Sequence, residues 1–253
     1  MPTPIDILLD PVTLCVLGLF AGLMLWERLA PGRPLPAVRG WLPRALVAMT
    51  AYLMLSSYLP LLWADALAPL QLFDLSGWPT VAAAAFGVGV YELGAYAYHR
   101  AMHTFTPLWR LLHQMHHSAE RQDVASAFWF SPLDMIGWTV VSSVTFTLAG
   151  LPPQAATPAI LFLTFLAIFQ HANVATPRWL GYLVQRPESH SLHHARGVHR
   201  DNYADLPVFD MLFGTFRNPP RHAPETGFWQ GASSRVVDMM LLRDVSSRPS
   251  DRG

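Results

Sequence analysis

The sequence contains no lysine and a single cysteine, Cys15, and only 13% of its 253 residues are charged. With one cysteine the chain forms no internal disulfide, and a structural zinc site built on several cysteine ligands is excluded. Arginines balance the acidic residues, so the formal net charge is zero and no surface for nucleic acid is expected. The charged share is about half that of an average soluble protein, and 52% of the residues are apolar. This composition predicts an integral membrane protein.

Five apolar runs approach the roughly 20 residues that a helix needs to cross a bilayer. They cover residues 11–26, 45–64, 79–98, 133–150 and 156–172. The last two are short and lie close together, so they form either a hairpin that dips into the bilayer or two full crossings. We therefore divide the chain into an N-terminal transmembrane region with two spans (1–80), a central region (81–220) and a C-terminal tail (221–253). We expect the tail to be frayed after about residue 233.

The arginines alternate with the spans. Four lie between the first and second runs, three between the third and fourth, and ten after the fifth, whereas the N-terminus and the loops at 65–78 and 150–155 contain none. Cytoplasmic loops of membrane proteins carry an excess of basic residues. We expect a multi-pass protein in the inner membrane of a bacterium, with its N-terminus outside and with residues 99–117, residues 190–199 and the C-terminus in the cytoplasm.

Eight of the eleven histidines fall into three tight clusters. Within each cluster the spacing is mainly three or four residues, which places side chains on one face of a helix. Neutral imidazole, the main form near pH 7, is a common metal ligand, whereas buried imidazoles without partners would cost roughly 1–3 kcal/mol each. With one histidine at the end of the fifth run, the candidate metal ligands number nine: His99, His103, His113, His116, His117, His171, His190, His193 and His194.

Nine imidazoles suit two metal ions that each keep an open position, and imidazole alone does not select among iron, zinc, copper and nickel. We therefore expect an all-α membrane bundle whose cytoplasmic helical cap carries a histidine-rich di-metal site. Three further polar residues are candidates for a supporting role: Asn173 and Asn202, which follow histidines closely, and the intramembrane carboxylate Glu92. His199 and His222 lie outside the tight spacing, and we expect them to be ordinary polar residues.

Two stretches of the sequence resemble the fatty acid hydroxylase and sterol desaturase superfamily, which contains membrane di-iron oxygenases with histidine boxes. The first runs from His99-Arg100-Ala101-Met102-His103 to His113-Gln114-Met115-His116-His117. The second contains His190-Ser191-Leu192-His193-His194, then Asn202-Tyr203 and Phe213-Gly214-Thr215-Phe216. The resemblance covers about 85–217, which makes 81–220 a hydroxylase-like catalytic region. Ala204 stands where many relatives have glycine, and Ala175 where some have a tenth histidine.

The resemblance implies an oxidoreductase with two iron ions that uses dioxygen and two electrons to hydroxylate or desaturate a lipid, such as a fatty acyl chain, sterol or isoprenoid. We also expect zinc as an alternative occupant of the site in the purified protein. The electrons are expected from a separate donor: a cytochrome b-type protein, a ferredoxin or a flavin reductase. Two alternatives remain open: a non-enzymatic metal-binding or metal-transport membrane protein, and a haem-binding electron-transfer subunit.

Overall fold

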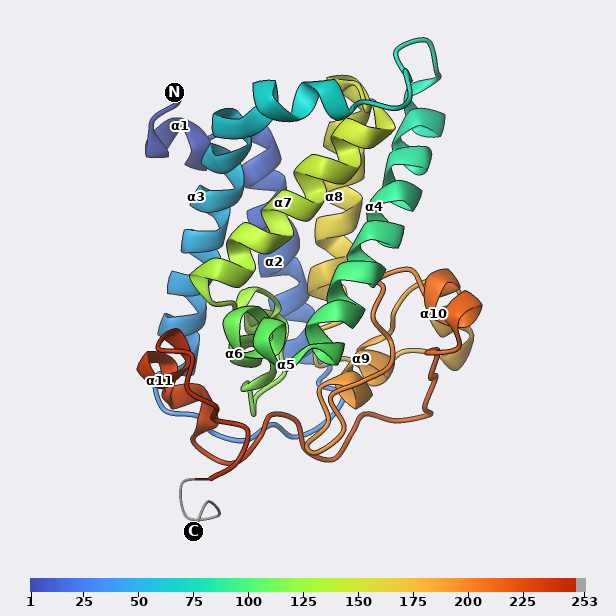
Figure 1. The fold of residues 1–253 in the computed structure, drawn as a ribbon. Helices are drawn as coiled ribbons and strands as arrows, with labels where there is room; N and C mark the ends of the chain where they lie inside the picture. The colour runs from blue at the N-terminus through green and yellow to red at the C-terminus, as the bar shows by residue number, and fades with distance from the viewer. Residues whose placement is uncertain (249–253) are drawn as a thin grey trace.

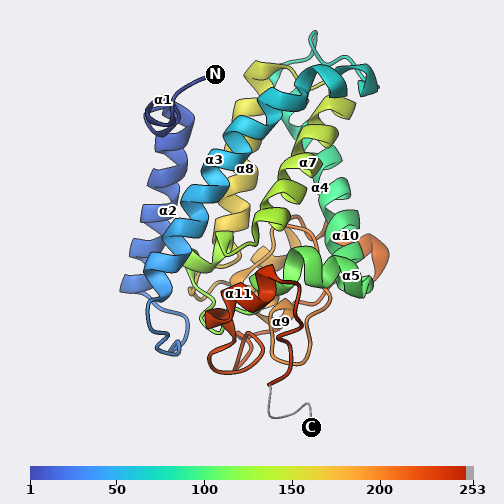
Figure 2. The same cartoon turned by 60° about the vertical axis from the view of Figure 1, so that its left-hand side comes forward.

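The computed structural model describes residues 1–248, and these residues form helices joined by loops, with two isolated β-bridges and no strand. The prediction of an all-α fold is therefore confirmed. Five long helices make an elongated bundle (Figures 1 and 2): α2 (Pro11–Leu29), α3 (Trp41–Leu67), α4 (Thr80–Thr104), α7 (Pro132–Ala149) and α8 (Pro153–Phe169). Three of the helical segments are long and apolar enough to span a membrane: Pro11–Leu29, Trp41–Leu70 and Thr80–Thr104.

Shorter helices surround one end of the bundle. They are α5 (Thr106–Leu108), η2 (Trp109–His113), α6 (Gln114–His117), η3 (Val124–Phe128), η4 (Arg178–Tyr182), α9 (Pro187–His193), α10 (Val208–Phe213), η5 (Ala232–Ser234) and α11 (Val236–Met240). The remaining two, α1 (Pro4–Leu8) and η1 (Ala68–Leu70), lie toward the opposite end, with the N-terminus (Figure 1). We call the end with α5, α6 and α9 the histidine end.

The boundaries of α7 and α8 have local causes. Ser131 caps α7 by accepting a hydrogen bond from the Asp134 backbone, and Pro132 takes the first helical position, where a missing N–H costs nothing. Gly150 ends the helix in a left-handed conformation (φ 61°), and a side chain there would collide with the Phe73 carbonyl.

The hairpin of α7 and α8 reaches the far end of the bundle. At its turn, the Leu148 carbonyl accepts hydrogen bonds from the backbone of Leu72 and Phe73, which lie in the loop between α3 and α4. With 18 and 17 residues, α7 and α8 are about 27 and 26 Å long. Both helices run along the bundle, but neither is among the three candidate membrane spans, so the re-entrant hairpin and the two full crossings both stay predictions.

Two apolar cores hold the bundle together. The core at the far end is rich in alanine and includes Ala84 and Ala155, and Gly87 of α4 faces the Leu151 side chain beside it. Small residues let helices approach closely, which is the main source of helix association where lipid removes the hydrophobic driving force. The second core, at the histidine end, is large and aromatic and includes Trp129.

The C-terminal segment does not fray after residue 233, and that part of the prediction is wrong for the described residues. Glu120 Oε1 accepts hydrogen bonds from the backbone of Gly231 (2.7 Å) and Ser233 (3.2 Å), and Gln114 Oε1 accepts one from Val245 (2.9 Å). Phe228, Trp229, Ala232, Met239 and Val245 pack on the aromatic core. The acceptors lie more than 100 residues earlier in the chain, so no local pattern announces the contact. Residues 249–253 lie outside the described part.

Removing the Glu120 carboxylate should release this C-terminal segment. In Glu120→Ala, the buried Ser233 N–H loses its acceptor at a cost of about 1–3 kcal/mol, and the partly buried Gly231 N–H loses its acceptor as well. Because the chain has no lysine, trypsin cuts only after arginine, and we expect faster cleavage at Arg235 and Arg243 in detergent. Glu225→Ala, which removes only an exposed ion pair with Arg196, is the matched control. Equal cleavage rates in the two variants would show that Glu120 does not hold the segment.

Candidate metal centre

The first pair of histidines lies on the last turns of α4. His99 and His103 are four residues apart on the continuous helix, so both rings leave the same face. His99 Nδ1 lies 2.7 Å from the Tyr203 carbonyl oxygen, and His103 Nδ1 lies 2.8 Å from that of His199. A ring that donates from Nδ1 keeps its lone pair on Nε2. Both Nε2 atoms therefore face inward as potential ligands.

The second cluster follows a π-helical turn, η2. In a π-helical turn each backbone hydrogen bond joins residues i and i+5, which changes the direction of the side chains that follow. Such turns are frequent at functional sites. His113 ends η2, and His116 and His117 lie on the next short helix, α6. His113 Nδ1 is 3.0 Å from Asp134 Oδ2 at the start of α7, and both side chains are fully enclosed.

The third cluster is built on α9, which begins at Pro187 and is held by a buried polar contact. Arg186 Nη2 lies 3.1 Å from Glu188 Oε2, and the Glu188 carboxylate accepts hydrogen bonds from the backbone and hydroxyl of Thr176. His193 Nδ1 lies 2.6 Å from the Asp201 carbonyl oxygen. These contacts fix α9 opposite α6, so its histidines face those of the second cluster.

The fold brings all nine predicted histidines together in two groups. In each group the nearest ring nitrogens all lie within 4.8 Å of one another. The five-histidine group contains His99, His103, His113, His117 and His193. The four-histidine group contains His116, His171, His190 and His194.

The spacing of the Nε2 atoms fits metal coordination. In the four-histidine group the pairs His116–His171, His171–His190 and His190–His194 are 3.2, 3.0 and 3.1 Å apart, and His99–His113 in the other group is 3.0 Å apart. For nitrogen ligands about 2.1 Å from a metal, right angles give about 3.0 Å between ligands and tetrahedral angles about 3.4 Å. The observed spacings are therefore short enough for the rings of each group to share one metal ion.

Several inward nitrogens have no hydrogen-bonding partner within the described residues. The Nε2 atoms of His103, His117 and His193 are buried and unpaired. Leaving such groups without water or a partner costs roughly 1–3 kcal/mol each. A bound cation removes this cost, so the donor set of the five-histidine group fits a metal ion. In the four-histidine group the Nε2 atoms lie 3.0–3.2 Å from one another, which also suits one shared cation.

Burial keeps these rings neutral. It lowers the pKa of His171 to about 4, and it lowers the pKa of His117, His193 and His194 well below 6.5, with neighbouring imidazoles adding to the shift. The pKa of His113, His116 and His190 is lowered for the same reasons. Neutral imidazole is the form that binds a metal.

The metal-free protein should lose thermal stability as the pH falls from 7.5 to 5. Unfolded imidazoles have a pKa near 6.5, whereas the folded values are lower, so below pH about 6.5 the unfolded chain binds more protons and unfolding becomes more favourable. The buried carboxyl groups of Asp123, Asp205 and Asp210, whose pKa burial raises, act in the opposite direction. They are fewer than the seven imidazoles described above. A melting temperature that stays constant or rises on acidification would contradict neutral, buried rings.

A strained loop supplies the outer hydrogen-bond acceptors. His199, Asp201 and Asn202 have φ of 43°, 67° and 53°, a left-handed region that costs a non-glycine residue about 1 kcal/mol or more. The carbonyl groups of His199 and Asp201 accept from His103 and His193. The strain therefore falls where the loop orients two rings of the five-histidine group.

None of the three polar residues expected in a supporting role contacts an imidazole directly. The amide of Asn173 bonds to the Arg33 backbone, and that of Asn202 to the backbone of Ser189 and Arg217. Glu92 Oε2 accepts a hydrogen bond from the Leu206 backbone (2.9 Å), at the end of the strained loop. Asn173 therefore joins two chain segments, while Asn202 and Glu92 brace the loop and α9.

Two residues with direct contacts were missed by the sequence analysis. Asp134 orients His113, as described above. His199 is not an ordinary polar residue, because its Nδ1 lies 3.0 Å from His117 Nδ1, in addition to its carbonyl contact with His103. A carboxylate in the first turn of an apolar helix was a usable signal for Asp134. The left-handed loop that places His199 has no signal of comparable clarity.

Comparisons with known proteins match the part of the chain that contains this site. The model of the family "Fatty acid hydroxylase" matches residues 84–215, just over half of the chain. The ornithine lipid hydroxylase OlsE of Rhizobium tropici is 30% identical over 152 residues, covering 57% of this chain and 44% of that protein. The Delta(7)-sterol-C5(6)-desaturase of Nicotiana tabacum is 32% identical over 154 residues, covering 56% and 53%.

The very-long-chain aldehyde decarbonylase GL1-5 of Oryza sativa subsp. indica is more distant, at 23% identity over 172 residues, covering 63% of this chain and 27% of that protein. This chain spans about half the length, or less, of the curated relatives that it matches. No solved structure matches it.

Proposed function

Because the chain belongs to the fatty acid hydroxylase family, we propose that it is a membrane-bound di-iron oxidoreductase that hydroxylates or desaturates a lipid. The observation that carries the proposal is the convergence of nine imidazoles into two adjacent groups inside the family-matched half of the fold. The family match, 84–215, falls within the proposed catalytic region, 81–220. The named relatives act on ornithine lipids and sterols, which supports a lipid substrate.

Each group would hold one iron ion through its Nε2 atoms, with zinc as a substitute in purified protein. The two ions would supply the oxidation of an unactivated C–H bond, using dioxygen and two electrons. For hydroxylation the substrate gains one oxygen atom, the other oxygen leaves as water, and two electrons and two protons are consumed. For desaturation the substrate loses two hydrogen atoms and both oxygen atoms leave as water. The electrons come from a separate cytochrome b-type protein, ferredoxin or flavin reductase.

The residues around the two groups have two tasks. The first is to orient the ligands: the carbonyl groups of Tyr203, His199 and Asp201 and the carboxylate of Asp134 fix the ring tautomers. The second is to exclude water. The ring of Trp109 packs against His103, and the ring of Phe130 packs against His116 with 4.6 Å between the ring centroids. A dry site limits side reactions of a strong oxidant.

We also propose that the histidine end faces the cytoplasm of a bacterial cell. The arginines of the described residues lie in the loops and helix ends at that end, and the far-end loops have none, which supports this orientation under the positive-inside rule. It would give a soluble or membrane-bound donor access to the site while the lipid arrives from the bilayer.

The test is a comparison of total lipids from a host that expresses the wild-type chain and from one that expresses His116→Ala. We expect a lipid class in the first host whose mass rises by one oxygen or falls by two hydrogens, with dioxygen as the source of any added oxygen. Identical lipid profiles, with the protein folded, iron-loaded and supplied with a reductase, would refute the proposed activity.

A further inference from the structure

Two short helices at the histidine end turn apolar side chains outward. On α11 and the residue that follows it, Val237, Met240 and Leu241 are 69%, 50% and 59% exposed. Met240 and Leu241 come three and four residues after Val237, so all three side chains share one face. On α10, Leu212 and Phe213 are 71% and 50% exposed. Short helices of a water-soluble surface rarely expose so much contiguous apolar area without a partner.

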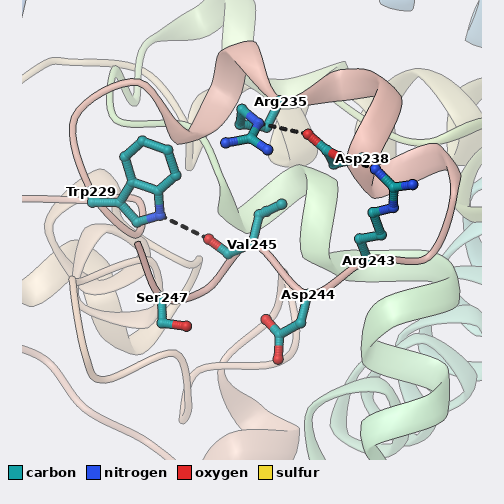
Figure 3. A pocket seen from close by; sticks show the side chains of 7 residues that line it. All are labelled: Trp229, Arg235, Asp238, Arg243, Asp244, Val245 and Ser247. Atoms are coloured by element: carbon teal, nitrogen blue, oxygen red, sulfur yellow. Dashed lines mark hydrogen bonds and ion pairs between the residues drawn. The ribbon is translucent and has the colours of Figure 1, made fainter. Parts of the chain in front are cut away.

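The polar side chains of α11 gather on another side of the helix. Asp238 receives hydrogen bonds from Arg235 Nε (2.6 Å) and Arg243 Nη1 (2.9 Å), and these residues line a cavity of about 230 Å³ together with Trp229 and Val245 (Figure 3). Met239, which lies between Val237 and Met240 in sequence, is buried in the aromatic core. The helix therefore has a buried anchor, an apolar outer face and a polar flank in which Arg235 and Arg243 are paired with Asp238.

On α10 the single charged residue is turned inward. Asp210 is fully buried and accepts hydrogen bonds from the backbone of Tyr203 and Ala204. The Tyr203 carbonyl in turn accepts from His99. The outward face of α10 thus carries no charge, and its inward face is connected to the five-histidine group.

The contacts of α10 fix its height along the bundle. Phe213 stacks on Tyr96 of α4, with ring centroids 4.9 Å apart. One turn from Tyr96 toward the far end is the exposed Leu93, and one turn toward the histidine end is the exposed Arg100, whose Nη1 donates to Tyr96 Oη. The helix therefore lies where the apolar surface of a candidate membrane span gives way to charge.

The height of α11 is fixed in the same way. Arg44 Nη1, in the first turn of α3, donates to the Ser233 carbonyl in η5, which directly precedes α11. The next exposed side chains along α3 are Leu46 and Val47, which are apolar. Figure 1 shows α10 and α11 on opposite sides of the bundle, both at its histidine end.

We propose that α10 and α11 are interfacial helices that insert their apolar faces into the lipid leaflet on the histidine side, with the flanking arginines at the level of anionic headgroups. Continuity with the exposed apolar surfaces of α3 and α4 identifies the occupant as lipid, since a bilayer that surrounds these spans reaches both helices. Aliphatic residues below a border of arginine are typical of helices that lie in the membrane interface. In this position, α10 links the leaflet to His99 by two hydrogen bonds: Asp210 accepts one from the Tyr203 backbone, and the Tyr203 carbonyl accepts one from His99.

The single cysteine permits a direct test that does not depend on activity. In a Cys15→Ser background, Leu212→Cys and Leu241→Cys are labelled with an environment-sensitive fluorophore and reconstituted in phosphatidylcholine vesicles with some phosphatidylglycerol. Leu93→Cys, on the outward face of α4, is the control for a deep lipid position. Arg196→Cys, in an exposed loop ion pair, is the control for water.

We expect blue-shifted emission at 212 and 241, with quenching roughly twofold stronger by a nitroxide near the headgroup than by one near the chain end. The label at 93 should show the reverse order, and the label at 196 little quenching by either. Emission at 212 and 241 like that at 196 would overturn the proposal. Blue-shifted emission without quenching would also overturn it, because the faces would then be covered by protein.

Discussion

His193→Ala should abolish lipid turnover and lower the metal content of the purified protein. His193 belongs to the five-histidine group, its Nε2 is buried and unpaired, and its Nδ1 is fixed by the Asp201 carbonyl. Alanine removes one ligand and leaves the loop acceptor without its donor. We expect at least about a 100-fold loss of turnover. Iron should fall from about two ions per chain to about one.

His222→Ala is the matched control for this prediction. His222 is a half-buried histidine at the same end of the protein, near Gly32 and outside both metal groups. We expect it to keep both turnover and metal content, so that a general effect of removing a histidine is separated from loss of a ligand. Retained turnover in folded His193→Ala would show that this ring is not a metal ligand.

Asp134→Asn should loosen the metal in the five-histidine group while leaving the other group intact. The buried carboxylate accepts the Nδ1 proton of His113 and so directs the Nε2 lone pair inward. An amide can instead donate to Nδ1, which moves the ring proton to Nε2 and blocks coordination there. Loss of such an outer partner typically lowers metal affinity 10–100-fold. We expect a chelator to remove about one of two ions much faster than in the wild type.

Ser142→Ala is the control for Asp134→Asn. Ser142 also lies on α7, but its hydroxyl bonds only to the Thr139 carbonyl of its own helix. Chelation kinetics in this variant should match those of the wild type. If Asp134→Asn also releases its metal at the wild-type rate, then His113 does not depend on the carboxylate for its orientation.

The sequence predicted the helices and the histidine groups because both depend on local patterns. Apolar runs at 45–64 and 79–98 identified α3 and α4, although the helices extend to Trp41–Leu67 and Thr80–Thr104. Their additional turns are polar or mixed and carry no hydropathy signal. The three- and four-residue spacing of the histidines likewise holds within single helical segments. Their convergence on one end of the bundle was predicted from the distribution of the arginines, which puts residues 99–117 and 190–199 on the same side.

What the sequence did not reveal depends on contacts between distant segments. Asp134 is 21 residues from His113, and His199 is 82 residues from His117. The C-terminal segment was misjudged for the same reason, since its acceptor Gln114 is 131 residues away from Val245. No periodicity connects such pairs. The left-handed residues of the loop after α9 add a second difficulty, because three non-glycine residues in that conformation are stabilised only by the folded surroundings.

The most direct test of a two-metal centre is metal analysis of the full chain purified without oxygen in mild detergent, with Mössbauer spectroscopy on protein grown with iron-57. Two buried imidazole groups predict about two iron ions per chain, in high-spin ferrous sites with nitrogen ligands, and their loss in parallel with turnover when the iron is chelated. Folded protein that reproducibly contains no iron, and takes up none when ferrous ion is supplied, would contradict the account.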